Sequence, residues 1–149
     1  MMKLISDLIM AERLDIAEDG VVSVSGVMGS WVTHNSSNQM TLTSAQVALA
    51  YPVWNESAVL AEGTKGYTPD VAESGVVTVL TGHHRALTNQ YTGTTPTVGD
   101  MLVASATVPG TLVVNNSPGS TQALAVCTKT EATVSYRGTE FTCIEYETI

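Results

Sequence analysis

The sequence contains few charged and few aromatic residues. Asp, Glu, Lys and Arg make up 13% of its 149 residues, about half the usual share, and aromatic residues make up 5%. Thr, Ser, Val, Ala and Gly are abundant instead. Because β-branched side chains lose rotamer freedom in a helix but fit a pleated sheet, this composition favours strands and turns over long solvated helices.

Positive charge is especially scarce. Six Lys and Arg stand against fourteen Asp and Glu, which gives a formal net charge of −8. Nucleic acid and anionic lipid attract basic surfaces, so the composition argues against binding to either of them. The low charge density leaves much uncharged polar surface, which is consistent with partial coverage by partner proteins.

Long apolar runs are also missing. No run approaches the ~18 apolar residues that a membrane-spanning helix requires. Asp7 interrupts the apolar stretch near the start of the chain, and no small-residue cleavage site follows it. We therefore expect neither a signal peptide nor a membrane span.

The chain has only two cysteines, Cys127 and Cys143. They form no CxxC pair, and no histidine is spaced from them as in a zinc site. We interpret both as small buried apolar side chains on strands. A disulfide between neighbouring strands and a reactive thiol are the alternatives.

Common catalytic motifs do not occur. The sequence contains no GxxxxGK[ST], no GxGxxG and no GxSxG. We therefore predict no catalytic, cofactor-binding or metal-binding residues, and we expect that the protein is not an enzyme and needs no cofactor.

From Tyr51 onward, short apolar segments alternate with turns that contain Gly or Pro. Strands of this length at this spacing are typical of a small antiparallel β-sandwich or barrel. Within the last segment, alternation places Ile144 and Tyr146 on the inner face, because Glu145 and Glu147 on the other face need water. The predicted strands are Val76–Leu80, Arg85–Tyr91, Asp100–Ser105, Thr111–Asn115, Ala123–Lys129, Ala132–Tyr136 and Phe141–Thr148.

The first fifty residues are less regular. Within Met1–Ile16, Leu4 and Leu8 belong to one apolar helical face, which predicts a short amphipathic helix that docks onto a partner or covers one end of the sheet. Val21–Val24 and Trp31–Thr33 are predicted strands, whereas residues 41–51 fit either a short helix or a strand. We therefore divide the chain into an N-terminal arm or helix with strands (residues 1–50) and a β-barrel or β-sandwich domain (residues 51–149).

The densest cluster of ionisable residues is His83-His84-Arg85, which follows Gly82. Adjacent residues of a strand point to opposite faces, so the two imidazoles cannot easily bind one metal ion. We place all three among the candidate interface residues, with Arg85 paired to a carboxylate. Ordinary turn residues, or a metal site with Asp70 or Asp100, are the alternatives.

Three further apolar residues complete the candidate interface. Leu4 and Leu8 lie on the N-terminal segment, and Trp54 lies between Val53 and Asn55. A single aromatic residue is more often part of a core than an interface anchor, so the core is the alternative for Trp54.

Five segments of the second half of the chain carry short motifs that glycines punctuate: Gly75–Gly82, Arg85–Tyr91, Val98–Val103, Gly110–Leu112 and Ala123–Lys129. Together these segments resemble capsid decoration, or cement, proteins of tailed bacteriophages. In that family a small β-barrel sits on the shell over the seams between major capsid subunits. The resemblance covers roughly residues 51–149 and does not extend to the first fifty residues.

The resemblance implies a structural protein on the outer surface of the capsid, assembled in the host cytoplasm. Its partners would be the major capsid protein and further copies of itself, as a homotrimer or homodimer, with no nucleic acid and no membrane. Binding only the assembled lattice would stabilise that lattice by mass action. The alternative is a tail, neck or fibre-associated β-domain of the virion, and an enzyme or sugar-binding module is a third class.

Overall fold

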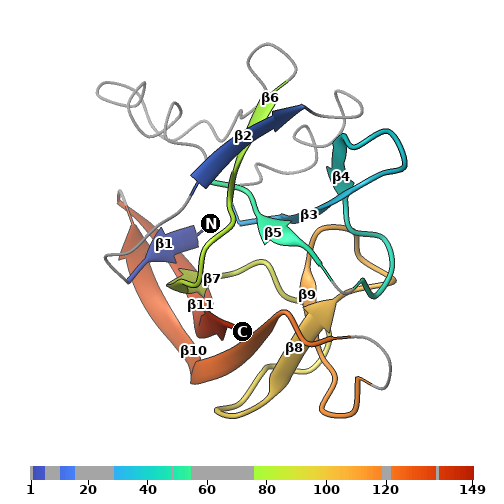
Figure 1. Ribbon diagram of the computed structural model, residues 1–149. Helices are drawn as coiled ribbons and strands as arrows, with labels where there is room; N and C mark the ends of the chain where they lie inside the picture. The colour runs from blue at the N-terminus through green and yellow to red at the C-terminus, as the bar shows by residue number, and fades with distance from the viewer. Residues whose placement is uncertain are drawn as a thin grey trace.

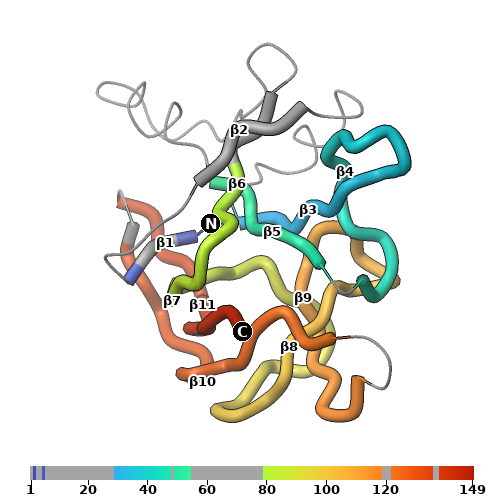
Figure 2. The backbone as a smooth tube through the Cα atoms, viewed as in Figure 1, coloured from blue at the N-terminus to red at the C-terminus, as the bar shows by residue number. Residues whose placement is uncertain are grey.

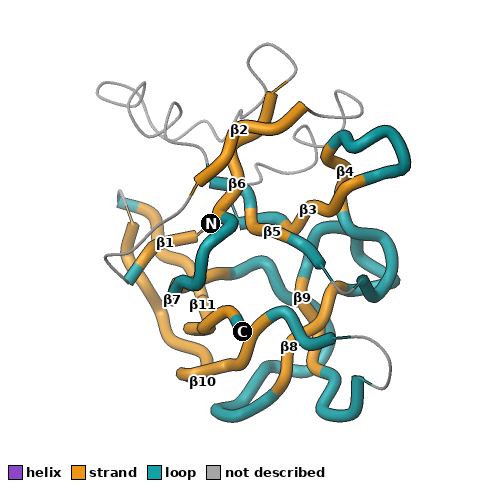
Figure 3. Tube along the Cα trace, in the orientation of Figure 1, coloured by secondary structure: helices purple, strands orange, loops and turns teal. Residues whose placement is uncertain are grey.

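The computed structural model describes residues 2–5, 11–15, 29–47, 49–54, 76–118, 122–136 and 138–149. Within these ranges the chain forms strands and loops and no helix, which confirms the predicted mainly β class (Figures 1 and 3). The strands are β1 (Met2–Leu4), β2 (Ala11–Asp15), β3 (Trp31–His34), β4 (Met40–Leu42), β5 (Tyr51–Pro52), β6 (Val76–Leu80), β7 (Arg85–Thr88), β8 (Met101–Ala104), β9 (Leu112–Val114), β10 (Ala125–Tyr136) and β11 (Thr139–Thr148).

The largest sheet has the strand order β1-β7-β11-β10-β8-β9, with every neighbouring pair antiparallel. β10 and β11 form a long hairpin that runs along one side of the molecule (Figure 2). At the other end of the sheet, the Leu112 N–H donates to the Gln90 carbonyl (3.0 Å), and the Leu112 carbonyl accepts from Thr92 N–H (2.8 Å). Because residues 90–92 directly follow β7, the sheet curls until β9 meets the chain beyond β7.

The remaining strands form two smaller sheets. One has the order β4-β3-β5, and the other pairs β2 with β6. Val53, just after β5, bridges Val79 of β6 and so joins the two small sheets. Gly110, in the turn before β9, donates to the Thr43 carbonyl and accepts from Trp31 N–H, both at 2.8 Å, and so ties β3 to the large sheet.

A single buried cluster draws side chains from all three sheets. Trp31 of β3 and Tyr146 of β11 are its largest members, with ring centroids 5.7 Å apart. Burial of Ile144 and Tyr146 confirms the predicted inner face of the last strand. The other buried members are Met2, Ala50, Leu80, Ala86, Leu102, Ala104, Leu112, Leu124, Ala125 and Cys127.

The start of the chain differs from the expected short helix. Its described residues are the strands β1 and β2, which pair with β7 and β6, respectively. A helix this short is unstable alone, whereas pairing with an existing strand gives the backbone hydrogen-bond partners at once. The described part of residues 41–51 likewise contains no helix. Leu8 and Val21–Val24 lie outside the described residues.

The predicted strands of the second half are present, although several of their ends differ from the prediction and two of them are joined. Ala123–Lys129 and Ala132–Tyr136 were expected as two strands, and the structure joins them in β10. Register shifts against β11 occur between Cys127 and Lys129 and again between Lys129 and Ala132. Such bulges let one strand continue through an irregularity.

Strand pairs cross the expected boundary at residue 50, since β1 pairs with β7 and β3 pairs with β5. The division of the chain into residues 1–50 and 51–149 stays a prediction.

Candidate functional site

The His83-His84-Arg85 segment leads from the turn at Gly82 into β7. β7 lies between β1 and β11, so each side chain of the segment faces a residue of β11 or the core. The register pairs Arg85 with Glu147 and Ala86 with Tyr146. This pairing brings together residues about sixty positions apart in the chain.

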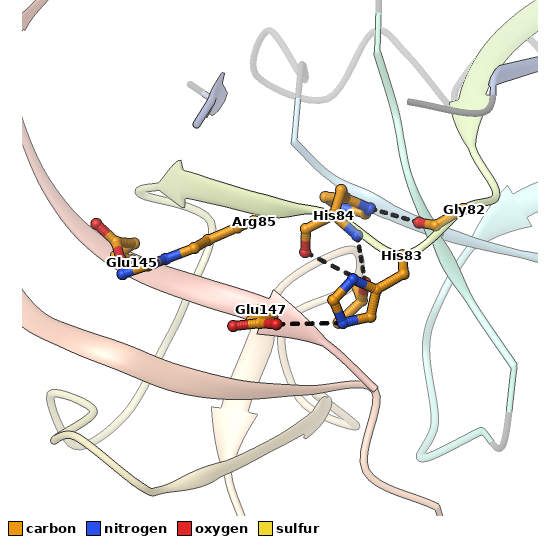
Figure 4. Close-up of polar contacts among 7 residues, drawn as sticks. Gly82, His83, His84, Arg85, Glu145 and Glu147 are labelled. Carbon is orange, nitrogen blue, oxygen red and sulfur yellow. Dashed lines mark hydrogen bonds and ion pairs between the residues drawn. The ribbon is translucent and has the colours of Figure 1, made fainter. Parts of the chain in front are cut away.

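His84 points into the core and is 1% exposed. Its Nδ1 lies 2.8 Å from the Gly82 carbonyl oxygen (Figure 4). Its Nε2 lies 3.0 Å from the Tyr146 hydroxyl. A carbonyl only accepts, so Nδ1 carries the hydrogen and the Tyr146 hydroxyl donates to Nε2. Burial lowers the pKa of His84, and the nearby His83 lowers it further, while the Gly82 hydrogen bond acts in the opposite direction. His84 is therefore a neutral imidazole whose two nitrogens both bond within the fold.

His83 and Arg85 point outward, on the side opposite to His84 (Figure 4). His83 Nε2 lies 3.3 Å from Glu147 Oε1, and the two side chains are 63% and 43% exposed. Arg85 Nε donates to Glu145 Oε1 at 2.6 Å, and its Nη2 forms an ion pair with the same oxygen. Arg85 thus reaches diagonally past its directly paired neighbour Glu147, a contact that long side chains on neighbouring strands can make.

Glu145 is a correction to the sequence interpretation. We expected this carboxylate to face water, but it is only 8% exposed. Arg85 covers it, and Thr128 Oγ1 donates to its Oε1 at 2.9 Å. Paired charge and hydrogen bonds make burial of a carboxylate tolerable, which the spacing of residues along a single strand does not reveal.

The metal-site alternative finds no support among the described residues. They contain no group of three or more His, Cys, Asp or Glu side chains that could hold a metal ion. Asp70 lies outside the described ranges. Asp100 instead accepts hydrogen bonds from Thr97 N and Oγ1 and from Asn116 Nδ2 (2.8–2.9 Å), and these bonds lower the pKa of its carboxyl.

The other candidate interface residues lie apart in the sequence from this segment. Leu4 belongs to β1, where its backbone pairs with Ala86 of β7. Trp54 is half-buried and packs against the core cluster, in agreement with its alternative interpretation. Leu8 is outside the described residues. A role in an interface stays a prediction for all six residues.

Both cysteines are free thiols, and both are buried. Cys127 is paired in register with Tyr146, whereas Cys143 is paired with Ala132. Burial raises the pKa of each thiol, which keeps both protonated at neutral pH. This confirms their interpretation as small buried side chains on strands.

The partners on β11 were not among the candidate residues. Alternation placed Tyr146 inside, but no local signal pointed to its hydrogen bond with His84. Glu145 and Glu147 were interpreted only as solvent-facing. Their roles depend on β7 lying beside β11, a pairing that local patterns do not specify.

The His83-His84-Arg85 segment therefore contacts β11 through all three of its side chains. Comparison of the chain with protein-family models, with curated protein sequences and with solved structures found no match. Within the described residues, no helix is long and apolar enough to cross a membrane.

Proposed function

We propose that this protein is a non-enzymatic structural component of a tailed-phage particle, which binds the outer surface of the assembled capsid and stabilises it across the seams between major capsid subunits. The observation that carries the structural part of this proposal is that His84, Arg85 and Glu145 bond to other residues of the fold. His84 and Arg85 belong to the densest cluster of ionisable residues in the sequence, and with Glu145 they make hydrogen bonds and an ion pair that brace β7 against β11.

The mainly β architecture supports the same proposal. The segments that resemble decoration proteins include β6, β7, most of β8 and the first part of β10, which are strands of the described fold. These proteins are small β-barrels, and here the large sheet curls back on itself through β9. The resemblance supplies the capsid location.

The surface is suited to contact with protein. A net charge of −8 disfavours direct contact with the packaged genome. Exposed apolar side chains are available for burial against a shell, among them Leu49 (57% exposed), Val98 (68%) and Ile149 (66%). A homotrimer or homodimer would match the symmetry axes of a shell and present several copies of this surface at once.

Particles assembled with and without the protein test the proposal. We expect particles that lack it to release DNA at a lower temperature, and purified protein added back to restore the release temperature. Dye-reported DNA release during heating measures both effects. Unchanged thermal and osmotic resistance without the protein would rule out a stabilising role.

The number of copies per particle separates this proposal from a tail, neck or fibre-associated role. A shell component must be present in numbers comparable with the capsid subunits, because it acts at repeated seams. A tail or neck component would be present in far fewer copies. Quantitative gel densitometry against the major capsid protein distinguishes the two.

A further inference from the structure

The β10–β11 hairpin extends beyond the strands on either side of it. Backbone bonds from β8 and from the turn before it reach no further along β10 than Cys127, and β7 pairs with residues 144–147 of β11. Among the residues that the structure describes, residues 132–136 of β10 therefore pair on one side only, with residues 139–143 of β11. β10 lies at the outside of the molecule (Figure 1). The sheet thus has an open edge along residues 132–136.

The register of the hairpin shows which backbone groups point outward at this edge. Tyr136 and Thr139 are paired across a two-residue connection, so their backbone groups bond to each other. In an antiparallel ladder such pairs alternate with pairs whose N–H and C=O groups point away from the partner strand. Thr133 and Ser135 belong to the second kind, so each presents an N–H and a C=O at the open edge. The side chains of both are exposed.

This edge lacks the usual protection against strand pairing. Natural edge strands carry charged residues, proline or bulges that prevent another strand from adding to them. Residues 132–136 contain no charged residue and no proline, and the register shifts of β10 end at Ala132. Because each copy of the chain has a net charge of −8, copies repel each other in general, and an uncharged segment is where they can meet at least cost.

The segment is complementary to itself in antiparallel orientation. When Val134 lies opposite the Val134 of a second copy, Thr133 of each copy lies opposite Ser135 of the other. The outward backbone groups of these two residues then bond to each other on both sides of a twofold axis. Their side chains form a hydroxyl pair of the kind that stabilises neighbouring strands, and no charged residue within the segment faces another.

We propose that residues 132–136 of β10 pair with the same residues of a second copy about a twofold axis, so that the two hairpins form one continuous antiparallel sheet. Addition of a strand at an open edge gains affinity from main-chain hydrogen bonds and specificity from the side chains along it. The role of this dimer rests on the proposed function, of which it is the homo-oligomer. Its formation is measured without capsids, so a monomeric protein would leave the capsid proposal standing, and unchanged particles would leave the dimer standing.

Two charge variants of the full chain test this register. In Thr133→Lys/Ser135→Lys each lysine lies opposite a lysine of the second copy, whereas in Thr133→Lys/Ser135→Glu each lysine lies opposite a glutamate. Both positions are exposed, so we expect both variants to keep the melting temperature of the natural protein within a few degrees. The double-lysine variant also has a smaller net negative charge, so general repulsion between copies would change in the direction opposite to the expected effect.

Sedimentation velocity from micromolar to near-millimolar concentration measures the association. We expect the natural protein to form dimers and the double-lysine variant to associate roughly tenfold more weakly or worse. The lysine–glutamate variant should associate at least as tightly as the natural protein at low salt, because opposite charges face each other across the axis.

Disulfide trapping provides a second measurement. Val134→Cys places two thiols opposite each other at the axis, in a pair with Cα atoms ~4.5 Å apart, which a disulfide can bridge. Thr142→Cys is the matched control, because it is exposed on β11 and both β10 strands would separate it from its copy. We expect cross-linking under mild oxidation, followed on non-reducing gels, to be roughly tenfold faster for Val134→Cys. The natural cysteines, Cys127 and Cys143, are buried and should not contribute.

Three results would overturn the proposal. One is a natural protein that stays monomeric or forms trimers, which would leave the open edge to a strand of a different protein. Another is equal association of the double-lysine and lysine–glutamate variants. The last is equal rates of cross-linking for Val134→Cys and Thr142→Cys. If a charge variant does not fold, the cross-linking comparison decides.

Discussion

At the residue scale, His84 illustrates how the fold uses an ionisable group as a structural one. Its ring lies between the Gly82 carbonyl and the Tyr146 hydroxyl, and its edge contacts the Tyr146 ring at a centroid distance of 5.6 Å. The Tyr146 hydroxyl also lies 3.2 Å from Met2 Sδ, so the contacts of His84 reach the N-terminal strand. Protonating His84 would take the acceptor at Nε2 away from Tyr146.

This arrangement predicts a pH dependence of stability. The folded pKa of His84 is lowered from its ordinary value of 6.5, so below that pH the unfolded state binds more protons than the folded state. The free energy of unfolding should therefore fall as the pH drops below 6.5 toward the folded pKa, by up to ~1.4 kcal/mol per pH unit. Urea unfolding between pH 5 and 8 measures this slope.

His84→Gln is the control for that prediction. It removes the titrating group and leaves the other histidines and carboxylates in place, so the difference in slope belongs to His84. Equal slopes in both proteins would contradict the prediction, whatever the difference in absolute stability.

Arg85 and Glu145 support a second prediction. Arg85→Met keeps the aliphatic stem but leaves the buried Glu145 carboxylate with Thr128 as its remaining described donor. We expect a cost of about 1–3 kcal/mol in the free energy of unfolding, because a buried charged acceptor loses its main partner. Glu147→Gln, in the exposed contact with His83, should cost less than ~0.5 kcal/mol.

The double variant Arg85→Met/Glu145→Leu distinguishes the stability cost of an unpaired charge from the cost of lost packing. Removing both partners should recover most of the loss, as replacing a buried ion pair by apolar groups often does. Denaturant titration of the natural protein, Arg85→Met, Glu147→Gln and the double variant measures the free energy of unfolding of each. A double variant no more stable than Arg85→Met would show that packing, and not the unpaired carboxylate, dominates.

At the element scale, turn residues in the sequence predict where a strand ends more reliably than the strand's own residues predict which strand it pairs with. Val76–Leu80 was predicted with its observed bounds, since a run of apolar β-branched residues is closed by Thr81-Gly82. The N-terminal segment was predicted as a helix because its apolar spacing fits 3.6 residues per turn. Pairing with β7 and β6 prevailed over that pattern, as tertiary contacts often do for short segments.

Gly110 lies in the turn that links the β4-β3-β5 sheet to the large sheet through backbone hydrogen bonds. It has a φ of +76°, and a Cβ placed there would lie 2.7 Å from Leu42 Cδ2 and 3.3 Å from Ser30 Cβ. Gly110→Ala should lower the free energy of unfolding by the cost of a left-handed residue, ~1–2 kcal/mol, plus a crowding cost.

Gly138→Ala is the matched control for this substitution. Gly138 has nearly the same φ, +78°, but a Cβ placed there would meet no atom within 4 Å beyond its own chain neighbours. We expect its cost to be that of the left-handed backbone alone, measured by the same urea titration. Equal costs at the two positions would mean that Leu42 and Ser30 yield to the added methyl group.

At the scale of the whole molecule, residues from opposite ends of the chain meet in one core. Met2 of β1 is fully buried, and its sulfur contacts Tyr146 of β11, which lies 144 positions away. Met2→Ala should therefore cost ~2–5 kcal/mol in the free energy of unfolding, through lost burial and a residual cavity.

Met101 offers a matched comparison on the surface. It is 39% exposed at the start of β8, and Met101→Ala should change stability by less than ~0.5 kcal/mol. Thermal or chemical unfolding of both variants checks the contrast. A small effect at Met2 would mean that β1 contributes little to the folded state.

The sequence by itself determined the mainly β class, most strand positions after residue 75, and the inward direction of Ile144 and Tyr146. These properties depend on local causes: β-branched composition, turn residues and the two-residue alternation of a strand. Only the tertiary structure decided that β1 is a strand, that Glu145 is buried, and that His84 bonds to Tyr146. Each of these follows from which distant strands lie side by side, and that choice is made by the packing of the whole chain and not by any local pattern.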